Sequence, residues 1–412
     1  MTLLEELKWR ELLYDVTDPE LEQKMEEENM TFYVGADPTA SSLHVGHLIS
    51  YLVSKRLQDK GHHPILVIGG GTGLIGDPSG RSTERQLLTL EESLDNAKKI
   101  TAQVKKILPD AEVVNNYDWI SNFDIISFLR DIGKHFNINY MLSKDSVKSR
   151  IDQGISFTEF SYQIIQSLDF MHLYKEHNCT MQIGGQDQWG NITAGLELIR
   201  KVLGHDKKGY GFTWPLLTKA DGTKFGKTAG GAIWLDKELT SVYEFYQYWI
   251  NTSDDDAVRY LKKFTFYSVE ETEAIIEEFK KAPHQRLAQR KIAETLTTLV
   301  HSKEEYESAV RISEALFSGN VGSLSKEEIE EGFKDVPSFE FSHDYNLVDA
   351  LIECKLASSK REAREFVKNN AVAINGEKQK DLDFVIQKSD AIEGHFTVLR
   401  RGKKKYALIK HV

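Results

Sequence analysis

The chain has few cysteines and no long hydrophobic run. Only two of its 412 residues are cysteine, Cys179 and Cys354, and they lie far apart in the sequence. This spacing offers neither a disulfide framework nor a zinc-ligand pattern, and it suits a reducing compartment such as the cytoplasm. The most apolar stretch, residues 65–75, is rich in glycine and too short to span a bilayer. The first residues, MTLLEELKWRELL, include acidic side chains, so we expect no signal peptide.

The chain also lacks an overall positive charge. Its formal net charge is −11 at pH 7, which argues against a uniformly basic nucleic-acid-binding protein. The charge is unevenly distributed: residues 345–412 contain 14 basic and 9 acidic side chains, whereas the rest of the chain carries a net charge of −16. A basic C-terminal segment on an acidic body indicates that this end of the molecule meets a polyanion. Counting alone leaves a chance asymmetry as the alternative.

The stretch on which the rest of the chain depends comes early, at residues 31–50. Alternating apolar residues from 32 to 36 predict a strand. Ser41 and Ser42 then offer good N-cap side chains. We therefore expect a helix from 43 to 60, directly after the strand.

The sequence His44-Val45-Gly46-His47 falls in the first turn of this expected helix. Unpaired backbone N–H groups and the helix dipole favour an anion there. Gly46 leaves space for close approach of a ligand. His44 and His47 are three residues apart, so they share a face and can donate to phosphate oxygens. An ordinary surface helix with two histidines is the alternative.

The surrounding pattern indicates an α/β domain. A nearly all-apolar run at 64–69 is typical of a buried parallel strand. Strand, helix and strand make a βαβ unit, which predicts a Rossmann-like parallel sheet. Further expected elements are helices at 91–108, 122–135, 155–175 and 191–204 and strands at 112–116 and 180–183.

A literal G-x-G-x-x-G pattern occupies residues 71–76, as in dinucleotide-binding folds. Its context differs, because the sequence Asp-Pro-Ser-Gly at 77–80 prevents a helix from opening inside the motif. We therefore expect a loop whose Arg81 and Arg85 reach phosphate, and not a redox cofactor site.

A second basic stretch, KADGTKFGKT, lies at residues 219–228. Lys224 and Lys227 stand in a glycine-rich polar run, which predicts a mobile basic loop. The stretch is one residue short of the P-loop pattern and lies late in the α/β region. Both features argue against a P-loop NTPase.

The order of these features resembles the paired HIGH and KMSKS signatures of class I aminoacyl-tRNA synthetases. The stretches GDPSGR, ISFTEFSY, GGQDQWGN and KADGTKFGKT make the chain similar to bacterial tyrosyl-tRNA synthetases over nearly its whole length. The resemblance implies activation of L-tyrosine by ATP, with release of pyrophosphate, and transfer of tyrosine to the 3′ end of tRNA(Tyr). It also implies a cytoplasmic homodimer with one tRNA lying across both subunits.

The resemblance assigns roles to matching residues. The implied catalytic residues are His44, His47, Arg81, Arg85, Lys224, Lys227 and Thr228. The implied tyrosine-binding residues are Tyr33, Asp77, Tyr162, Gln166, Asp169 and Gln188. The implied ATP-binding residues are Gly35, Asp37, Thr39, His44, Gly46, His47, Ser50, Gly185, Asp187 and Lys227. Mg²⁺ would arrive with the nucleotide, bound mostly by phosphate and water, with no protein-ligated metal.

Asp169 has a physical reason for its implied role. A buried acceptor rejects phenylalanine, because binding that amino acid would leave a polar group unpaired. A carboxylate on a surface helix is the alternative. Phe225 and Gly226 depart from the methionine and serine of the second signature, and we expect Gly226 to loosen that loop.

Beyond the loop the pattern becomes helical and then mixed. We expect a Rossmann-like catalytic domain at 1–220, a KMSKS-type loop at 221–240, a helical anticodon-side domain at 241–318, a linker with little core at 319–345, and a small α+β domain at 346–412. The last segment resembles the RNA-binding module first named for ribosomal protein four. Its implied RNA-binding residues are Lys360, Arg361, Arg364, Lys368, Arg400, Arg401, Lys403, Lys404 and Lys405.

Two other functions stay open on the sequence. Tryptophanyl-tRNA synthetases share the expected fold and both signatures, although Tyr33 and Asp169 favour a phenol over an indole. An RNA-binding protein with a synthetase-like body that has lost catalysis is the second alternative. The intact His44, His47, Lys224 and Lys227 argue against it.

Overall fold

The computed structural model describes residues 1–412 except 80–86, 149, 153, 224, 229–230 and 403–404, and it leaves undescribed the side chains of residues 145, 146, 227 and 228. The chain forms two compact units. The first comprises residues 1–240 and 248–300, and the second comprises residues 241–247 and 301–412.

The first unit is built on a six-stranded sheet with the order β1-β6-β5-β2-β3-β4. Its strands are β1 (Asp15–Val16), β2 (Thr31–Ala36), β3 (His63–Ile68), β4 (Glu112–Asn115), β5 (Cys179–Gly185) and β6 (Tyr210–Trp214). Neighbouring strands run parallel except β1, which is antiparallel to β6. The predicted Rossmann-like parallel sheet is confirmed. The strand order reverses between β2 and β5, and ligands bind at such a switch point in open α/β sheets.

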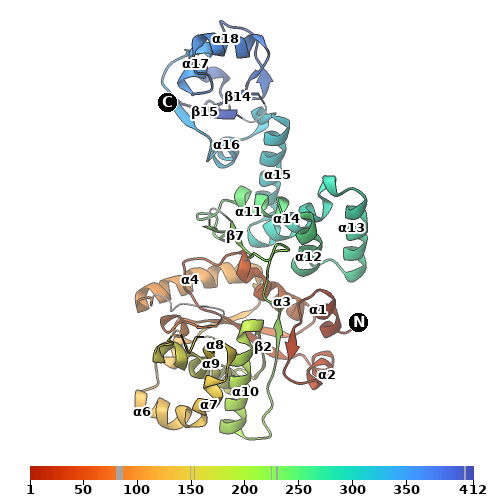
Figure 1. The fold of residues 1–412 in the computed structure, drawn as a ribbon, viewed down its shortest axis with the longest axis vertical. Helices are drawn as coiled ribbons and strands as arrows, with labels where there is room; N and C mark the ends of the chain where they lie inside the picture. Colours follow the sequence, from red (N-terminus) through yellow and green to blue (C-terminus); the bar gives the residue numbers. More distant parts are fainter. Residues whose placement is uncertain (80–86, 149, 153, 224, 229–230, 403–404) are drawn as a thin grey trace. The chain divides into compact units, whose positions relative to one another are not determined.

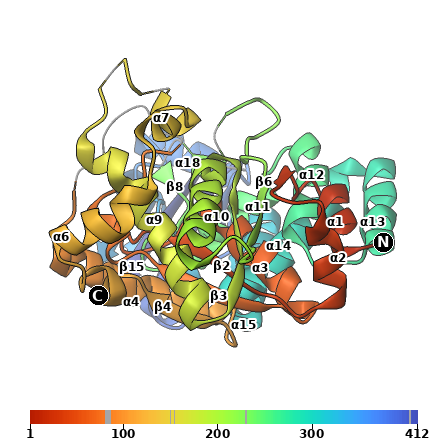
Figure 2. The same cartoon turned by 90° about the horizontal axis from the view of Figure 1, so that it is seen from below.

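Four long helices pack on this sheet. They are α3 (Leu48–Asp59), α4 (Leu90–Ile107), α9 (Phe157–Glu176) and α10 (Trp189–Leu203). Helices α9 and α10 lie side by side and contact β5, whereas α3 and α4 contact β3 (Figures 1 and 2). Buried residues of the strands and of α9 and α10, among them Ile65, Val67, Phe170 and Leu198, form a shared core. This core fixes the carboxyl ends of the central strands.

Two expected helices differ in the structure. The segment 122–135 is broken into α6 (Ile125–Ser127), a π-helical turn (Phe128–Ile132) and a 3₁₀ turn (Gly133–His135), and only Ile132 among these is buried. Because most helical stability in proteins comes from packing of an apolar face, a segment with so little apolar burial is stabilised little by forming one continuous helix. The helix expected from residue 43 begins at Leu48, after a 3₁₀ turn over Val45–His47.

Three helices that follow the basic loop group with the α/β body. They are α12 (Asp254–Phe264), α13 (Val269–Lys281) and α14 (Leu287–Val300). The buried Arg10, just after α1 (Leu3–Trp9), donates to the carbonyl oxygens of Lys262 at 3.0 Å and Tyr267 at 2.6 Å. These contacts help to explain why the compact units do not follow the expected boundary between the catalytic domain and the helical domain at 241–318.

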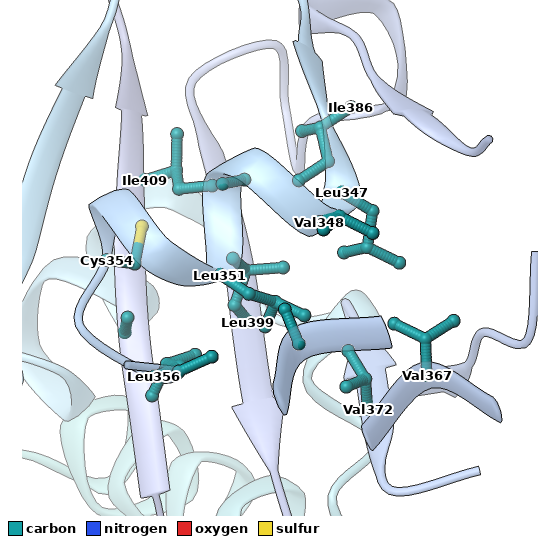
Figure 3. Close-up of a cluster of buried hydrophobic side chains, with 14 of the residues drawn as sticks. Leu347, Val348, Leu351, Cys354, Leu356, Val367, Val372, Ile386, Leu399 and Ile409 are labelled. Atoms are coloured by element: carbon teal, nitrogen blue, oxygen red, sulfur yellow. The ribbon is translucent and has the colours of Figure 1, made fainter. Parts of the chain in front are cut away.

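The second unit contains α15 (Lys303–Ser318), α16 (Lys326–Gly332), α17 (Leu347–Glu353) and α18 (Lys360–Lys368). Its five-stranded sheet has the order β12-β11-β14-β15-β9, with β9 (Ser338–Phe341), β11 (Val372–Ile374), β12 (Glu377–Lys378), β14 (Phe396–Arg401) and β15 (Lys405–His411). Figure 3 shows the buried side chains of the region, where Leu351 and Val367 from the helices meet Leu399 and Ile409 from the sheet. The predicted α+β architecture of this end is present.

The segment 319–345, expected to be a linker with little core, carries regular structure. It contains α16 and β9, and β9 pairs with β15 in parallel. Leu324 and Phe333 are buried and share a cluster with Ile312 of α15 and Leu408 of β15. The sequence pattern missed this core because its apolar residues are few and are completed by distant strands.

Candidate active site

A cavity of about 1040 Å³ lies in the first unit at the switch point of the sheet. All six residues expected to bind tyrosine line it: Tyr33, Asp77, Tyr162, Gln166, Asp169 and Gln188. Eight of the ten expected ATP-binding residues also line it: Gly35, Asp37, Thr39, Gly46, His47, Ser50, Gly185 and Asp187. His44 is not part of the lining. Strand β2 and the segments after β2 and β5 supply much of the wall, as expected for this fold.

Asp169 lies on α9, where its carboxylate is only 3 % exposed. It accepts hydrogen bonds from Trp119 Nε1 at 2.8 Å and from Asn116 Nδ2 at 2.9 Å. Burial raises the pKa of Asp169 to about 7, although the two hydrogen bonds oppose that shift. The expectation of a buried acceptor at this position agrees with the geometry.

The hydroxyl of Tyr33 is buried without a hydrogen-bond partner. Burial, and then the charge of Asp169, raise the pKa of Tyr33 well above its usual value. The ring is held edge-on to Phe170, with centroids 5.3 Å apart. A buried unpaired hydroxyl costs free energy, so a ligand that bonds to it is favoured. A ligand hydroxyl can accept from Tyr33 and donate to Asp169.

A second group of polar side chains presents acceptors to the cavity. Gln166 Nε2 donates to Gln188 Oε1 at 3.3 Å, which leaves Gln166 Oε1 buried without a partner. Gln188 Nε2 in turn donates to Asp77 Oδ2 at 2.8 Å. The Tyr162 hydroxyl donates a hydrogen bond to Asp37 Oδ2 at 2.9 Å. Its oxygen can therefore only accept a hydrogen bond from a ligand. An amide oxygen, a phenol oxygen and a carboxylate suit an ammonium cation.

The His44–His47 turn has a geometry of its own. His44 Nδ1 accepts from the Gly46 amide at 3.0 Å, and His47 Nδ1 accepts from the His44 amide at 3.2 Å. The two rings are stacked with centroids 3.9 Å apart. Because each Nδ1 accepts, each neutral ring carries its proton on Nε2. His44, rather than Ser41 or Ser42, caps the turn.

Gly46 lies close to the imidazole of His44. A Cβ built on Gly46 would lie 2.7 Å from His44 Cε1 and 2.9 Å from His44 Nδ1. The glycine therefore makes room for this imidazole, and the expected clearance for a ligand stays a prediction.

The KFGKT stretch is anchored at its centre. Phe225 is 7 % exposed and packs its ring against Tyr260 and Phe264 of α12, with centroids 5.2 and 5.3 Å apart. Gly226 has a φ of +79°, and its amide donates to the Tyr248 hydroxyl at 3.3 Å. The glycine supplies a left-handed conformation at this position, and the expectation that it loosens the loop stays a prediction.

The two signature stretches are joined by backbone hydrogen bonds. The Val45 amide donates to the Ile233 carbonyl at 2.9 Å, and the Ile233 amide donates to the Gly226 carbonyl at 3.3 Å. Lys224, Arg81 and Arg85 lie outside the described residues, as do the side chains of Lys227 and Thr228. The expected contacts of these five side chains stay predictions.

Several lining residues were not expected from the sequence. Among them are Thr72, Asn116 and Gln182, whose exposed fractions are 2, 1 and 2 %. Asn116 directly follows β4, so the rule that polar residues at strand ends face the ligand crevice could have found it. Thr72 sits inside the G-x-G-x-x-G stretch, where a 3₁₀ turn over Thr72–Leu74 takes the place of a cofactor-binding helix.

The basic residues of the second unit differ in their surroundings. Arg361, Arg364 and Lys368 are exposed on α18, and Lys405 is exposed at the start of β15. Lys360 is paired with Asp349 at 2.6 Å, and Arg400 is half-buried. Lys403 and Lys404 lie outside the described residues.

Arg401 is the exception among these expected RNA-binding residues. Its Nη1 donates to the Leu356 carbonyl at 2.6 Å, and its guanidinium lies 4.7 Å from the ring centroid of Phe366. These two contacts hold the guanidinium of Arg401 against the second unit.

The described residues contain neither a metal-binding cluster nor a membrane-spanning helix. Within these residues, no group of three or more His, Cys, Asp or Glu side chains is arranged to hold a metal ion. None of the helices among them is both long and apolar enough to cross a membrane.

Comparisons with known proteins cover the whole chain. Residues 25–318 match the family model of class I tRNA synthetases (W and Y), and residues 328–409 match the SYY-like C-terminal domain of tyrosine–tRNA ligases. The chain is 57 % identical to a tyrosine–tRNA ligase of Bacillus velezensis over 418 aligned residues, which cover 99 % of each protein. It is 55 % identical to tyrosine–tRNA ligase 1 of Bacillus subtilis, again over 99 % of each.

Solved structures agree on the fold. A C-terminally truncated mitochondrial tyrosyl-tRNA synthetase of Aspergillus nidulans superposes with a TM-score of 0.70 and 32 % identity, over 77 % of this chain and 94 % of that one. A tryptophanyl-tRNA synthetase of Encephalitozoon cuniculi superposes with a TM-score of 0.55 at 16 % identity, over 74 % of this chain and 87 % of that one. At this low identity the similarity shows the fold alone.

Proposed function

The chain belongs to the class I tRNA synthetases of the tryptophan and tyrosine group, and on this premise we propose how its cavity performs their reaction. The protein is a tyrosine–tRNA ligase, which activates L-tyrosine with ATP and transfers it to the 3′ end of its tRNA. The roles of the individual residues below are our assignment.

The phenol of the substrate lies between Tyr33 and Asp169. Tyr33 donates to the substrate hydroxyl, and that hydroxyl donates to Asp169. The observation that carries this assignment is the buried carboxylate of Asp169 beside the unpaired buried hydroxyl of Tyr33. Phenylalanine would leave both groups unpaired in a dry site, which disfavours its binding.

The α-ammonium group of the substrate binds the acceptors of Gln166, Tyr162 and Asp77. Gln166 and Tyr162 each donate a hydrogen bond within the protein, and the buried Gln166 Oε1 has no partner, so acceptor oxygens are available to the ammonium group. The substrate carboxylate then points toward Asp37 and Gln188 and attacks the α-phosphate of ATP. This nucleophile is already ionised, so the protein needs no general base and acts by positioning the reactants.

The phosphates of ATP lie at the His44–His47 turn. The Nε2–H groups of the two imidazoles donate to phosphate oxygens as charge develops on the leaving pyrophosphate. Lys224, Lys227 and Thr228 contact the pyrophosphate from one loop, and Arg81 and Arg85 contact it from the other. Mg²⁺ enters with ATP and is held mainly by phosphate oxygens and water.

The second unit binds tRNA through exposed cations. Arg361, Arg364 and Lys368 project from α18, and Lys405 begins β15 nearby in the same fold. Such residues contact phosphate and supply affinity that falls as salt concentration rises. We place the enzyme in the cytoplasm, where tRNA is charged.

A homodimer is also part of the proposal. Residues 123–157 expose eight large apolar side chains: Phe123, Ile125, Ile126, Leu129, Ile138, Tyr140, Ile151 and Phe157. An apolar surface of this kind on one segment is typical of a protein–protein interface. A second copy of the chain covers it.

The assignment of Asp169 is tested by equilibrium binding to the purified dimer. Asp169→Ala should weaken tyrosine binding about a hundredfold and leave ATP binding within about twofold, because the lost acceptor faces only the phenol. Thr295→Val, which removes a hydroxyl that bonds to the Lys291 carbonyl of its own helix and does not line the cavity, is the control for folding and should leave tyrosine binding intact. An equal loss for both substrates in Asp169→Ala would remove Asp169 from its assigned role.

A further inference from the structure

Thr72 occupies a position between the two ends of the cavity. Its hydroxyl donates to Asp37 Oδ1 at 2.6 Å and accepts from Asn116 Nδ2 at 2.9 Å. Asn116 Nδ2 also donates to Asp169 Oδ2 at 2.9 Å. A continuous chain of hydrogen bonds therefore runs from Asp169, at the phenol end, to Asp37, at the nucleotide end.

The direction of each bond in this chain is fixed. Asn116 Oδ1 accepts from the Gly71 amide at 2.8 Å, so its Nδ2 must face Thr72 and Asp169. Because Nδ2 donates to the hydroxyl of Thr72, the hydroxyl proton must point to Asp37. The other oxygen of Asp37 accepts from Tyr162. Both oxygens of the Asp37 carboxylate are thus held.

The glycine-rich run after β3 makes room for this arrangement. A Cβ built on Gly69 would lie 2.1 Å from Asp37 Oδ1 and 2.3 Å from Thr72 Oγ1. The hydrogen bond between Thr72 and Asp37 therefore passes directly over Gly69, where only a hydrogen atom fits. This gives the G-rich stretch a purpose that its resemblance to a dinucleotide fingerprint does not explain.

We propose that Thr72 is a positioning residue that couples tyrosine recognition at Asp169 to adenylate formation beside Asp37. The proposal rests on the placement of tyrosine and ATP given above. Without the hydroxyl, the buried amide of Asn116 loses an acceptor and holds Asp169 less firmly. Asp37 loses a hydrogen-bond donor, so its negative charge is less stabilised. This charge lies near the reacting carboxylate and the phosphates, which are also negative and repel it. A single substitution at Thr72 should therefore impair both tyrosine binding and adenylate formation.

The test is single-turnover formation of tyrosyl-adenylate by the full-length enzyme. Thr72→Val keeps the shape and removes the hydroxyl, whereas Thr72→Ser keeps the hydroxyl. Thr72→Val should raise the Kd of tyrosine about tenfold and lower the rate constant of the chemical step about tenfold, as expected for one lost buried hydrogen bond at each end. Thr72→Ser should stay within about twofold of wild type, and the Kd of ATP should not change in either variant.

Thr295→Val is the matched control. Thr295 is half-buried on α14, and its hydroxyl bonds only within its own helix, to the Lys291 carbonyl at 2.8 Å. This variant should match wild type in all three constants. If Thr72→Val does not fold, Thr72→Ala replaces it with the same expectation.

Three results would overturn the coupling. Thr72→Val could match wild type, Thr72→Ser could be as impaired as Thr72→Val, or the loss could be confined to tyrosine binding or to the chemical step alone. A wild-type enzyme that forms no adenylate with tyrosine would instead contradict the proposed function, independently of any Thr72 variant.

Discussion

Trp119 donates its indole N–H to the carboxylate of Asp169 at 2.8 Å, and both side chains are buried. The bond holds a charged acceptor in place, yet burial still raises the pKa of Asp169 from 3.8 to about 7. The carboxylate is therefore costly to ionise in the folded enzyme. This cost has a consequence for stability.

The stability of the enzyme should fall as pH rises from the ordinary pKa of an aspartate, 3.8, to the folded pKa of about 7. A carboxyl whose pKa is raised in the folded state contributes most below its unfolded pKa, and the contribution is lost as pH rises toward its folded pKa. Between pH 5 and pH 8 the wild type should lose about 2 kcal/mol relative to Asp169→Asn, which cannot ionise. Urea unfolding of both proteins at the two pH values measures this difference. Identical pH dependence of the two proteins would contradict the burial of a titrating carboxyl.

Gly226→Ala should slow tyrosine activation about tenfold without changing the Kd of tyrosine. Gly226 has a φ of +79°, and an added Cβ would lie 3.1 Å from Val45 Cγ2 and 3.2 Å from the Gly46 nitrogen, so it would push apart the two signature stretches. Pre-steady-state kinetics of adenylate formation measure the effect.

Gly222→Ala provides the control for this prediction. Gly222 has a similar φ of +81°, but nothing lies within 4 Å of an added Cβ. A comparable loss in both variants would show that backbone strain, and not the contact with Val45, is responsible.

Much of this cavity could be predicted from local sequence, and some of it could not. The spacing of Tyr162, Gln166 and Asp169 placed them on one helix face, and the strand before Asp37 was recognised from its alternation. The roles of Thr72 and Asn116 could not be predicted, because they depend on the neighbouring ends of β3 and β4, which lie far apart in the sequence. The conformation of Gly226 could not be predicted either, because its amide bonds to the hydroxyl of the distant Tyr248.

Truncation should separate amino-acid activation from tRNA charging, provided that the cut respects the core of the second unit. A chain ending at Val300 should activate tyrosine and fail to charge tRNA. A chain ending at Asp344 should aggregate, because it keeps Ile312 and Phe333 but loses their buried partner Leu408. Pyrophosphate exchange, tRNA charging and light scattering distinguish these outcomes. Normal charging by the chain ending at Val300 would exclude a role for the second unit in tRNA binding.

Ile125→Asp with Ile126→Asp should convert the proposed dimer to monomers. Both side chains are largely exposed, at 72 % and 66 %, and charge on them would have to be buried at the proposed interface. Light scattering after size-exclusion chromatography measures the change in mass. Leu239→Asp, at a side chain 48 % exposed outside this segment, should leave the dimer intact. A dimer that survives the double substitution would place the interface elsewhere.

The most direct test of the account is ATP–pyrophosphate exchange by the purified enzyme without tRNA, with tyrosine, phenylalanine and tryptophan supplied separately. The unpaired buried hydroxyl of Tyr33 and the buried carboxylate of Asp169 predict exchange with tyrosine and none above background with the other two amino acids. Exchange with phenylalanine at a comparable rate would show that the buried hydroxyl and carboxylate do not select the phenol. Exchange with tryptophan, or with none of the three, would contradict the assignment of the cavity.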